Sequence, residues 1–323
     1  MTPESITCPV CHGASTEVKR LSSEVIRTNL ARLYEEPSAM QIAIPDYTTR
    51  RCNACTLEFA NPMLPGDAAF YGWIVKHLAY YPSERWGWST IRDQLQSLAA
   101  FRQNSPFMVM DVGCGGGAFL AYIGGIANLR NIGIDTTASS VAACNARGLE
   151  VYCCDIAMGR QHAPGGIDAV TSFHCLEHVP DPVGFVEEAK ALLAPNGRIF
   201  ISTPYSPMSF EETWFDPLNH PPHHLSRWNE KAYEALAART GLQIRIHLGP
   251  TSSLLRRTLW SLLLVAGQAP FLPRPKVVKL ALLGLYCLTH PLRVLKEFRA
   301  QATRRKVAGR VAPDEILVEL VKP

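Results

Sequence analysis

The chain contains 323 residues with a formal net charge of +4, of which 47% are hydrophobic and 19% are charged. This balance excludes an intrinsically disordered chain, and the length suits one large domain with additions or two domains. The polar N-terminus carries no apolar signal segment, so we expect a cytoplasmic protein. In that setting the ten cysteines indicate reduced thiols and metal binding rather than disulfides.

Two Cys-x-x-Cys pairs lie in the N-terminal region, Cys8 with Cys11 and Cys52 with Cys55. Each spacing lets two thiolates face one ion, and two such pairs complete a closed tetrahedral zinc site. We therefore predict a small, ribbon-like zinc-binding module over residues 1–65, with strands near 41–44 and 48–50. A closed site of four sulfurs stabilises a fold, so the predicted role of the zinc is structural.

A glycine-rich turn follows residues 66–105, which we expect to form a helical linker or lid. It places Asp111, Gly113, Gly115 and Gly117 at alternate positions between two apolar runs. This order predicts strand, turn and helix, with backbone N–H groups open to a ligand. The acid before the first glycine disfavours a pyrophosphate, and therefore a dinucleotide-binding dehydrogenase.

Two more predicted strands end in an acid, at Asp135 and at Asp155. An acid about twenty residues after the glycine turn suits the two hydroxyls of a ribose. Because the carboxyl ends of parallel strands meet at one edge of a sheet, we expect these acids and Asp111 to line one ligand site.

With these motifs, residues 106–250 and the C-terminal strand resemble the class I S-adenosylmethionine-dependent methyltransferases. The matching segments are residues 111–117, 133–135, 154–156 and 173–182. The resemblance implies an α/β fold with a doubly wound, Rossmann-like sheet of seven strands over residues 106–323. It also implies the cofactor contacts: Gly113, Gly115 and Gly117 under the methionine end, Asp111 near its amino group, Asp135 at the ribose, Asp155 and Ile156 at the adenine, and Phe173 beside them.

The fourth predicted strand, 167–173, is followed by His174, Glu177 and His178. The strand end points His174 at the reactive sulfonium region, which makes it a catalytic candidate. Some quinone O-methyltransferases bind a divalent metal with a similar Glu-x-x-Glu-His arrangement, in which His174 replaces the first acid here. The prolines that follow predict a non-helical loop. The sequence leaves open whether this loop binds a metal or supports the cofactor edge.

A histidine-rich run after the fifth predicted strand contains His220, His223 and His224. Histidine titrates near neutrality, so it suits proton removal from a hydroxyl or an acidic carbon. The chain is also similar to bacterial methyltransferases with an N-terminal zinc module, including sugar C-methyltransferases that act on nucleotide sugars. That resemblance implies His224 as the base, with His223 beside it where those enzymes carry an acid, and Tyr81 in the substrate pocket.

Residues 251–313 form a basic insertion between the predicted strands 242–248 and 315–321. They contain twelve Lys and Arg residues against one acid, Glu297, and two apolar runs at 259–265 and 277–288. Each run is shorter than the roughly twenty residues of a membrane span. Basic, apolar helices suit an anionic membrane surface, whereas the alternative is a lid packed on the protein. We see no nucleic-acid-binding module.

These observations predict a methyltransferase that uses S-adenosylmethionine, carries structural zinc and modifies a small molecule. The main hypothesis is a nucleotide-linked sugar, or a sugar of a glycan or lipid pathway, with a histidine base. One alternative is a metal-assisted quinone or other small-molecule O-methyltransferase, and a second is a non-catalytic module that binds cofactor or membrane. The expected location is cytoplasmic, or peripheral at the inner membrane surface if the insertion binds lipid. The acceptor atom and the oligomeric state stay open.

Overall fold

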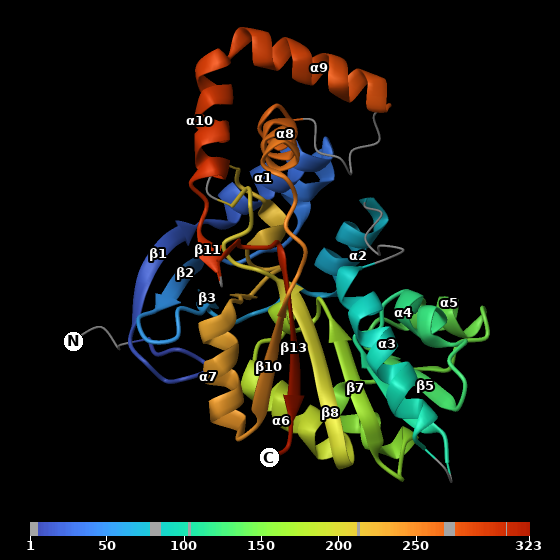
Figure 1. Ribbon diagram of the computed structural model, residues 1–323. Coiled ribbons are helices and arrows are strands. Elements are labelled where there is room, and N and C mark those ends of the chain that lie inside the picture. Colours follow the sequence, from blue (N-terminus) through green and yellow to red (C-terminus); the bar gives the residue numbers. More distant parts are fainter. Residues whose placement is uncertain (1–5, 78–84, 103–104, 212–213, 268–274, 308) are drawn as a thin grey trace.

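The computed structural model describes residues 6–77, 85–102, 105–211, 214–267, 275–307 and 309–323. A seven-stranded sheet with the order β10-β13-β8-β7-β4-β5-β6 forms its centre (Figure 1). The strands from β8 to β6 are parallel, and β13 is antiparallel to both of its neighbours. The predicted doubly wound α/β sheet is thereby confirmed. Its strands are β4 (Phe107–Val112), β5 (Leu129–Asp135), β6 (Val151–Cys153), β7 (Ile167–Phe173), β8 (Leu193–Pro204), β10 (Gln243–Leu248) and β13 (Glu315–Val321).

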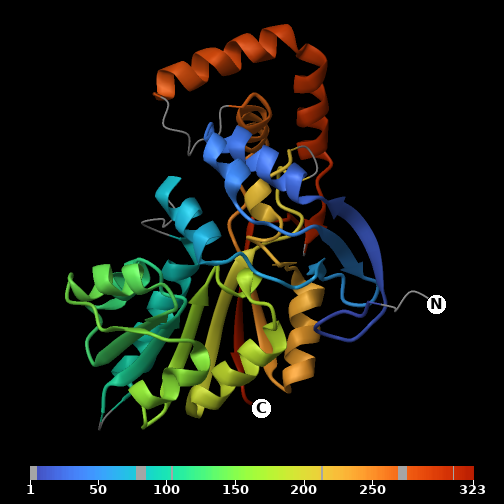
Figure 2. The same cartoon turned by 180° about the vertical axis from the view of Figure 1, so that it is seen from behind.

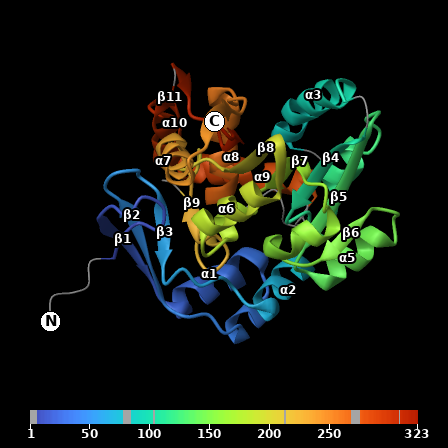
Figure 3. The same ribbon diagram turned by 90° about the horizontal axis from the view of Figure 1, so that it is seen from below.

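Helices cover both faces of this sheet (Figure 3). In β4, Val109 points to the cluster that contains α3 and α4, whereas Met110 points to the cluster that contains α6 and α7. Burial on both faces explains why consecutive residues of β4, Phe107–Met110, are apolar rather than alternating with polar ones. The helices are α3 (Trp86–Ala100), α4 (Ala118–Ile123), α5 (Ala138–Asn145), α6 (Pro182–Leu192) and α7 (Glu230–Thr240).

A second, antiparallel sheet has the order β1-β2-β3-β9. Its first three strands belong to the N-terminal region, whereas β9 follows the histidine-rich run of the main domain and pairs Arg227 with Glu58 and Ser226 with Phe59. The two regions therefore share one sheet. Its elements and the adjoining helices are β1 (Ser15–Leu21), α1 (Ser23–Tyr34), β2 (Tyr47–Cys52), β3 (Glu58–Asn61), α2 (Ala68–His77) and β9 (Ser226–Arg227).

One strand expected in the N-terminal region is wrong. Residues 41–44 were predicted to be extended, but Pro37–Gln41 form a 3-10 helix and the next residues lie outside any strand. Pro37 fixes the φ angle of the first helical turn, and Pro45 lacks the N–H that a ladder needs. Ile42 and Ile44 are buried instead as core side chains. The strand expected near 48–50 is confirmed as part of β2.

The insertion before the last strand is helical, as predicted. It comprises α8 (Leu254–Val265), α9 (Lys276–Thr289), α10 (Pro291–Ala302) and the short strands β11 (Lys306–Val307) and β12 (Arg310–Val311). Helix α8 packs against α10, where Ser261 Oγ donates a hydrogen bond of 2.7 Å to the buried Glu297 Oε2. Helix α9 lies across the end of the molecule farthest from the large sheet (Figures 1 and 2).

Helix α9 exposes most of its apolar side chains. Only Leu283 is buried, whereas Val277, Leu285 and Leu288 are 78%, 59% and 82% exposed. Within the described ranges, no helix is by itself long and apolar enough to span a membrane. Helices α9 and α10 reach the length and apolar composition of a membrane span only when they are taken together. The chain bends by 103° at the break between them.

An ion-pair network joins the two regions beside the β3–β9 pairing. Arg227 Nη2 contacts Glu58 Oε2, and its Nη1 lies 3.0 Å from Glu211 Oε1. Glu58 is buried and also contacts Arg51. Because buried charges are costly without partners, this network favours one placement of β9 against β3.

We expect Arg227→Ala to lower the free energy of unfolding by about 3 kcal/mol, since it leaves buried carboxylates with fewer partners. Arg130→Ala is the matched control, because its pair with Glu150 is largely exposed and should contribute less than about 1 kcal/mol. Urea unfolding of both variants measures the difference. Equal losses would contradict a structural role for the buried network.

Candidate functional site

The glycine turn after β4 requires glycine for two reasons. Its φ angles are 71° at Gly113, 51° at Gly115 and 69° at Gly117, in the left-handed region. In addition, a Cβ at Gly113 would lie 2.6 Å from Cys175 Sγ. The turn therefore lies directly against the segment that follows β7. This contact brings the predicted cofactor loop next to the predicted catalytic loop.

Asp111 is buried at the end of β4. Its Oδ1 accepts a hydrogen bond of 2.8 Å from Thr171 Oγ1. Burial raises the pKa of Asp111, the Thr171 hydrogen bond lowers it and the charge of Asp135 raises it, so that the pKa of Asp111 is about 7. A cationic group beside this carboxylate would favour its ionised form.

The other predicted cofactor residues lie at the same edge of the sheet. Asp135 accepts backbone hydrogen bonds of 2.8 Å from the N–H groups of Gly115 and Thr137, which fixes its carboxylate next to the glycine turn. Asp155 caps a 3-10 helix (Ile156–His162) by accepting from Met158 N at 3.1 Å. Its side chain is exposed and Ile156 is half-buried. Their cofactor roles stay predictions.

Phe173 is the last residue of β7 and is 9% exposed. Its ring centroid lies 4.5 Å from that of Phe119 and 6.1 Å from that of Trp88. The ring therefore belongs to the core under α3 and α4. Its contact with the cofactor stays a prediction.

His174 lies between two carboxylates. Its Nδ1 is 3.4 Å from Glu177 Oε1, and its Nε2 is 3.4 Å from Glu315 Oε1. Burial and the charge of Arg85 lower the pKa of His174, but the two carboxylates outweigh them and raise it overall. Burial opposes ionisation of Glu177, whereas His174 and His178 hold its pKa below the usual value.

The loop after β7 is not wholly non-helical, in contrast to the prediction. Residues Leu176–His178 form a 3-10 turn, and helix α6 begins at Pro182. A proline disfavours helical geometry only at the residue directly before it, which is Val179 for Pro180. A single helical turn can therefore form at the residues before Val179. This turn points Glu177 into the protein, where it is 1% exposed.

Three histidines meet beside Glu177. His178 comes from the 3-10 turn, and His223 and His224 come from the histidine-rich run before β9. His178 Nδ1 donates to the carbonyl oxygen of His223 at 2.6 Å, His223 Nδ1 to that of Leu218 at 2.8 Å, and His224 Nδ1 to Asn219 Oδ1 at 3.1 Å. His224 Nε2 lies 3.9 Å from Glu177 Oε1.

Burial lowers the pKa of all three imidazoles. The shift is largest for His223 and His224, whose histidine neighbours add to it. All three rings are therefore neutral near pH 7. A lowered pKa also weakens a histidine as a proton acceptor, which counts against His224 as the base predicted from sequence.

The structure adds two residues to the candidate site that the sequence did not predict to lie there, Glu315 and Tyr71. Glu315 opens the last strand, and the sequence signal for it is an acid directly before the three apolar residues 316–318. Tyr71, on α2, places its ring centroid 6.2 Å from that of His178 and 6.0 Å from that of His223. Tyr81, the tyrosine predicted to reach the substrate, lies outside the described residues.

The four N-terminal cysteines converge on one point. Cys8 Sγ lies 3.6 Å from Cys55 Sγ, Cys11 Sγ lies 3.3 Å from Cys52 Sγ, and all four sulfurs are within 4.8 Å of one another. Sulfurs on one tetrahedral zinc ion are on the order of 3.8 Å apart. The four residues therefore fit a closed zinc site.

The two cysteine pairs have the same backbone geometry. His12 and Thr56 each follow the second cysteine, with φ angles of 58° and 63°, and their N–H groups donate back to the carbonyl oxygens of Cys8 and Cys52. Each tight turn directs both of its thiols to one side. Two matching turns of this kind are what a four-sulfur metal site requires.

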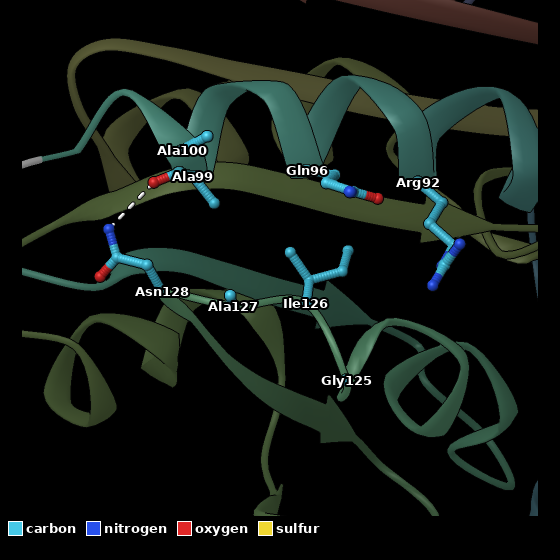
Figure 4. Close-up of a pocket in the computed structure, with 8 residues that line it drawn as sticks. All are labelled: Arg92, Gln96, Ala99, Ala100, Gly125, Ile126, Ala127 and Asn128. Carbon is cyan, nitrogen blue, oxygen red and sulfur yellow. Dashed lines mark hydrogen bonds between the residues drawn. The ribbon is translucent and has the colours of Figure 1, made fainter.

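The pocket of Figure 4 is separate from these residues. It lies between α3 and the start of β5, where Asn128 Nδ2 donates to the carbonyl oxygen of Ala99 at 2.9 Å (Figure 4). This is the amino edge of the sheet, opposite the glycine turn. Ligands of open α/β sheets bind at the carboxyl edge, so we do not assign the cofactor to this pocket.

The family model described as a methyltransferase domain matches residues 84–246, just over half of the chain. The chain belongs to this family. With its seven-stranded sheet, it is a member of the class I S-adenosylmethionine-dependent methyltransferases.

The chain is also similar to curated relatives. The ubiquinone biosynthesis O-methyltransferase of Cupriavidus pinatubonensis is 40% identical over 102 residues, which is 29% of this chain and 40% of that protein. The enzyme of the same name from Bordetella bronchiseptica is 35% identical over 125 residues, 37% of this chain and 48% of that protein. The matches thus span less than half the length of these relatives.

Among solved structures, the plantazolicin methyltransferase BamL in complex with a triazolic desmethylPZN analog and SAH covers 93% of this chain and 96% of its own. Its sequence identity is 13% and its TM-score is 0.47.

The raised pKa of Asp111 predicts a pH-dependent stability without cofactor. The folded state keeps a proton that the unfolded state has released, so this group destabilises the fold as the pH rises from about 4 to about 7. Asp111→Asn should therefore exceed the native protein in unfolding free energy by roughly 2–4 kcal/mol at about pH 8, and by much less at about pH 5. Urea unfolding at both pH values measures the two free energies. If they differed by the same amount at about pH 5 and about pH 8, the titration of Asp111 would not be the cause.

Proposed function

We propose that this protein transfers a methyl group from S-adenosylmethionine to a hydroxyl oxygen of a small, hydroxylated aromatic acceptor of the quinone type. The observation that carries the proposal is the contact between Gly113 and Cys175. It sets the cofactor turn directly against a buried acid–base cluster, in which His174 and Glu177 flank that cysteine. Methyl transfer and proton removal can therefore occur side by side.

Two considerations favour this acceptor over the sugar hypothesis. The curated relatives are named ubiquinone biosynthesis O-methyltransferases, and they match at 32% identity or more. A phenolic hydroxyl is also far more acidic than a sugar hydroxyl, so a single histidine suffices to remove its proton. The sugar acceptor remains the competing outcome of the test below.

The expected roles of the residues follow from their positions. Gly113, Gly115 and Asp135 hold the cofactor, and Asp111 faces its cationic methionine end. Because the transfer is a direct displacement at a reactive cation, positioning contributes most of the rate. His174 is the best-placed base of the three predicted histidines, since Glu177 and Glu315 orient it and stabilise the imidazolium that forms.

The direct test supplies methyl-labelled cofactor with a hydroxylated aromatic acceptor, with a nucleotide sugar, or with neither. We expect label on a ring oxygen of the first acceptor. His174→Ala should slow turnover at least about 100-fold with unchanged cofactor affinity, whereas Asp135→Ala should abolish cofactor binding in calorimetry. Label on the sugar alone would overturn the acceptor assignment. If the protein binds the cofactor but forms no methylated product, the result would favour a non-catalytic module.

We also propose that Cys8, Cys11, Cys52 and Cys55 bind a structural zinc ion, on the basis of their converging sulfurs. Because a metal that binds only the folded state contributes its binding energy to folding, its removal should destabilise the N-terminal sheet. We expect Cys11→Ser to lose one equivalent of zinc and to unfold at a lower urea concentration. Cys287→Ser, outside this group, is the control. Unchanged zinc content in Cys11→Ser would contradict the site.

The exposed apolar side chains of α9 support a third proposal, that the insertion binds an anionic membrane surface. Exposed basic side chains, including those of Lys276, Lys296 and Arg299, accompany them. A lid packed on the protein would bury this apolar surface, as α8 does through Leu262 and Leu264. A membrane location would also suit a lipid-soluble acceptor.

Vesicle flotation tests this proposal. The protein should bind phosphatidylglycerol vesicles more strongly than phosphatidylcholine vesicles, and the double variant Leu285→Glu with Leu288→Glu should reduce binding at least about tenfold. Phe101→Glu is the matched control, because Phe101 is 84% exposed at the end of α3. The native protein failing to bind anionic vesicles would refute the proposal.

A further inference from the structure

Arg304 follows the end of α10 by two residues, and its guanidinium contacts four oxygens. Nε donates to the carbonyl oxygen of Ala312 at 3.1 Å, and Nη2 donates to those of Pro207 at 3.1 Å and Pro313 at 2.9 Å. Nη2 also lies 3.2 Å from Asp314 Oδ1, and the Arg304 side chain is 9% exposed. A planar fork of N–H donors can bind several oxygens at once, which the compact ammonium of a lysine cannot reproduce.

Asp314 is held from its other side by the segment that follows β8. Its carboxylate accepts hydrogen bonds from Ser209 N at 2.6 Å and from Ser209 Oγ at 2.9 Å, and its carbonyl oxygen accepts from Tyr205 N at 3.0 Å. Gln301, in the last turn of α10, donates to the carbonyl oxygen of Ser209 at 2.5 Å. Three segments that are distant in the chain therefore meet at Asp314 and Arg304.

Glu315 directly follows this junction. It opens β13 opposite Pro204 of β8, and its carbonyl oxygen accepts from Gly249 N at 3.3 Å. Its Oε1 lies 3.4 Å from His174 Nε2. A displacement of Asp314 would therefore move the carboxylate that faces the proposed base. Misplacement of a reacting group by about 1 Å can slow a reaction on the order of 100-fold.

We propose that Arg304 is a positioning residue, which fixes Asp314 and thereby holds Glu315 in place against His174. The inference rests on the proposed function, in which His174 removes the proton of the acceptor hydroxyl. Arg304 contacts backbone oxygens and the carboxylate of Asp314, so it acts through its neighbours and is not a catalytic residue. The insertion thus takes part in arranging the active edge.

Turnover of the full-length protein with methyl-labelled cofactor and a hydroxylated aromatic acceptor tests this role. Arg304→Ala should lower kcat about 10–100-fold and leave the KM for the cofactor within about twofold, because the glycine turn is not part of the junction. Arg304→Lys should recover part of the loss, since it restores the charge beside Asp314 but not the planar fork. Arg310→Ala, at an exposed arginine of the same insertion, is the matched control and should keep full activity.

A double variant separates positioning from a general loss of stability. If Arg304 acts through Glu315, then Arg304→Ala should add less than about twofold to the loss of kcat that Glu315→Gln causes. Losses that multiply in full would overturn the proposal. Asp314→Ala tests the same link if Arg304→Ala does not fold, because the Asp314 side chain is 47% exposed. It should also lower kcat, and an unchanged kcat would overturn the proposal.

Hydrogen–deuterium exchange gives a readout that needs neither cofactor nor acceptor. The amide of Tyr205 donates to the carbonyl oxygen of Asp314. Arg304→Ala should therefore accelerate exchange at Tyr205 at least about tenfold and leave the β8 amide of Ile199 unchanged. Unchanged exchange at Tyr205 would overturn the role of Arg304. A native protein that methylates no acceptor would instead overturn the proposed function, so the two failures are distinguishable.

Discussion

The pairing of β3 with β9 is the constraint on which the site depends. Strand β9 is only Ser226–Arg227, too short to hold a position by its own hydrogen bonds. It is held by the ion pairs of Arg227, and Leu225 beside it donates to the carbonyl oxygen of Glu177 at 2.7 Å while accepting from Ala60 N at 2.7 Å. Leu225 thus connects the N-terminal sheet to the loop after β7. The histidines directly before it are placed by the same contacts.

This arrangement gives the cysteine site a role beyond the stability of its own turns. Strand β2 ends at Cys52, and β3 begins three residues after Cys55. Thr56, at the centre of the second tight turn, also donates its hydroxyl to Asn229 Oδ1 at 3.1 Å. A metal that fixes these turns would therefore also fix β3, the strand against which β9 pairs. We infer that the N-terminal region holds the histidine-rich run in place at the carboxyl edge of the large sheet.

The electrostatics of that edge favour cations. Asp111 and Glu177 are both buried, and Glu177 has a compensating partner in His174, whose Nδ1 lies 3.4 Å from Glu177 Oε1. Ionised carboxylates in such surroundings are stabilised by positive charge from outside. A sulfonium cofactor with an amino group would supply it near Asp111.

Local sequence signals predicted most of the fold. Apolar runs located the strands, the glycines located the turn at Gly113, and the cysteine spacing located the N-terminal cluster. Contacts distant in the chain were not predictable, because no local pattern encodes them. The pairing of β9 with β3 belongs to this group, as do the contact of His174 with Glu315 and the position of Tyr71. The exposure of α9 was also undecidable, since an apolar, basic helix fits a lid or a membrane surface equally well.

Hydrogen–deuterium exchange at the amide of Leu225 tests the central claim most directly. We compare the native protein with Cys11→Ser, using the β8 amides of Ile199 and Ile201 as the internal reference. If the N-terminal region holds the histidine-rich run in place, loss of the cysteine site should accelerate exchange at Leu225 by at least about tenfold and leave the β8 amides unchanged. Unchanged exchange at Leu225, with the cysteine site demonstrably lost, would contradict the account.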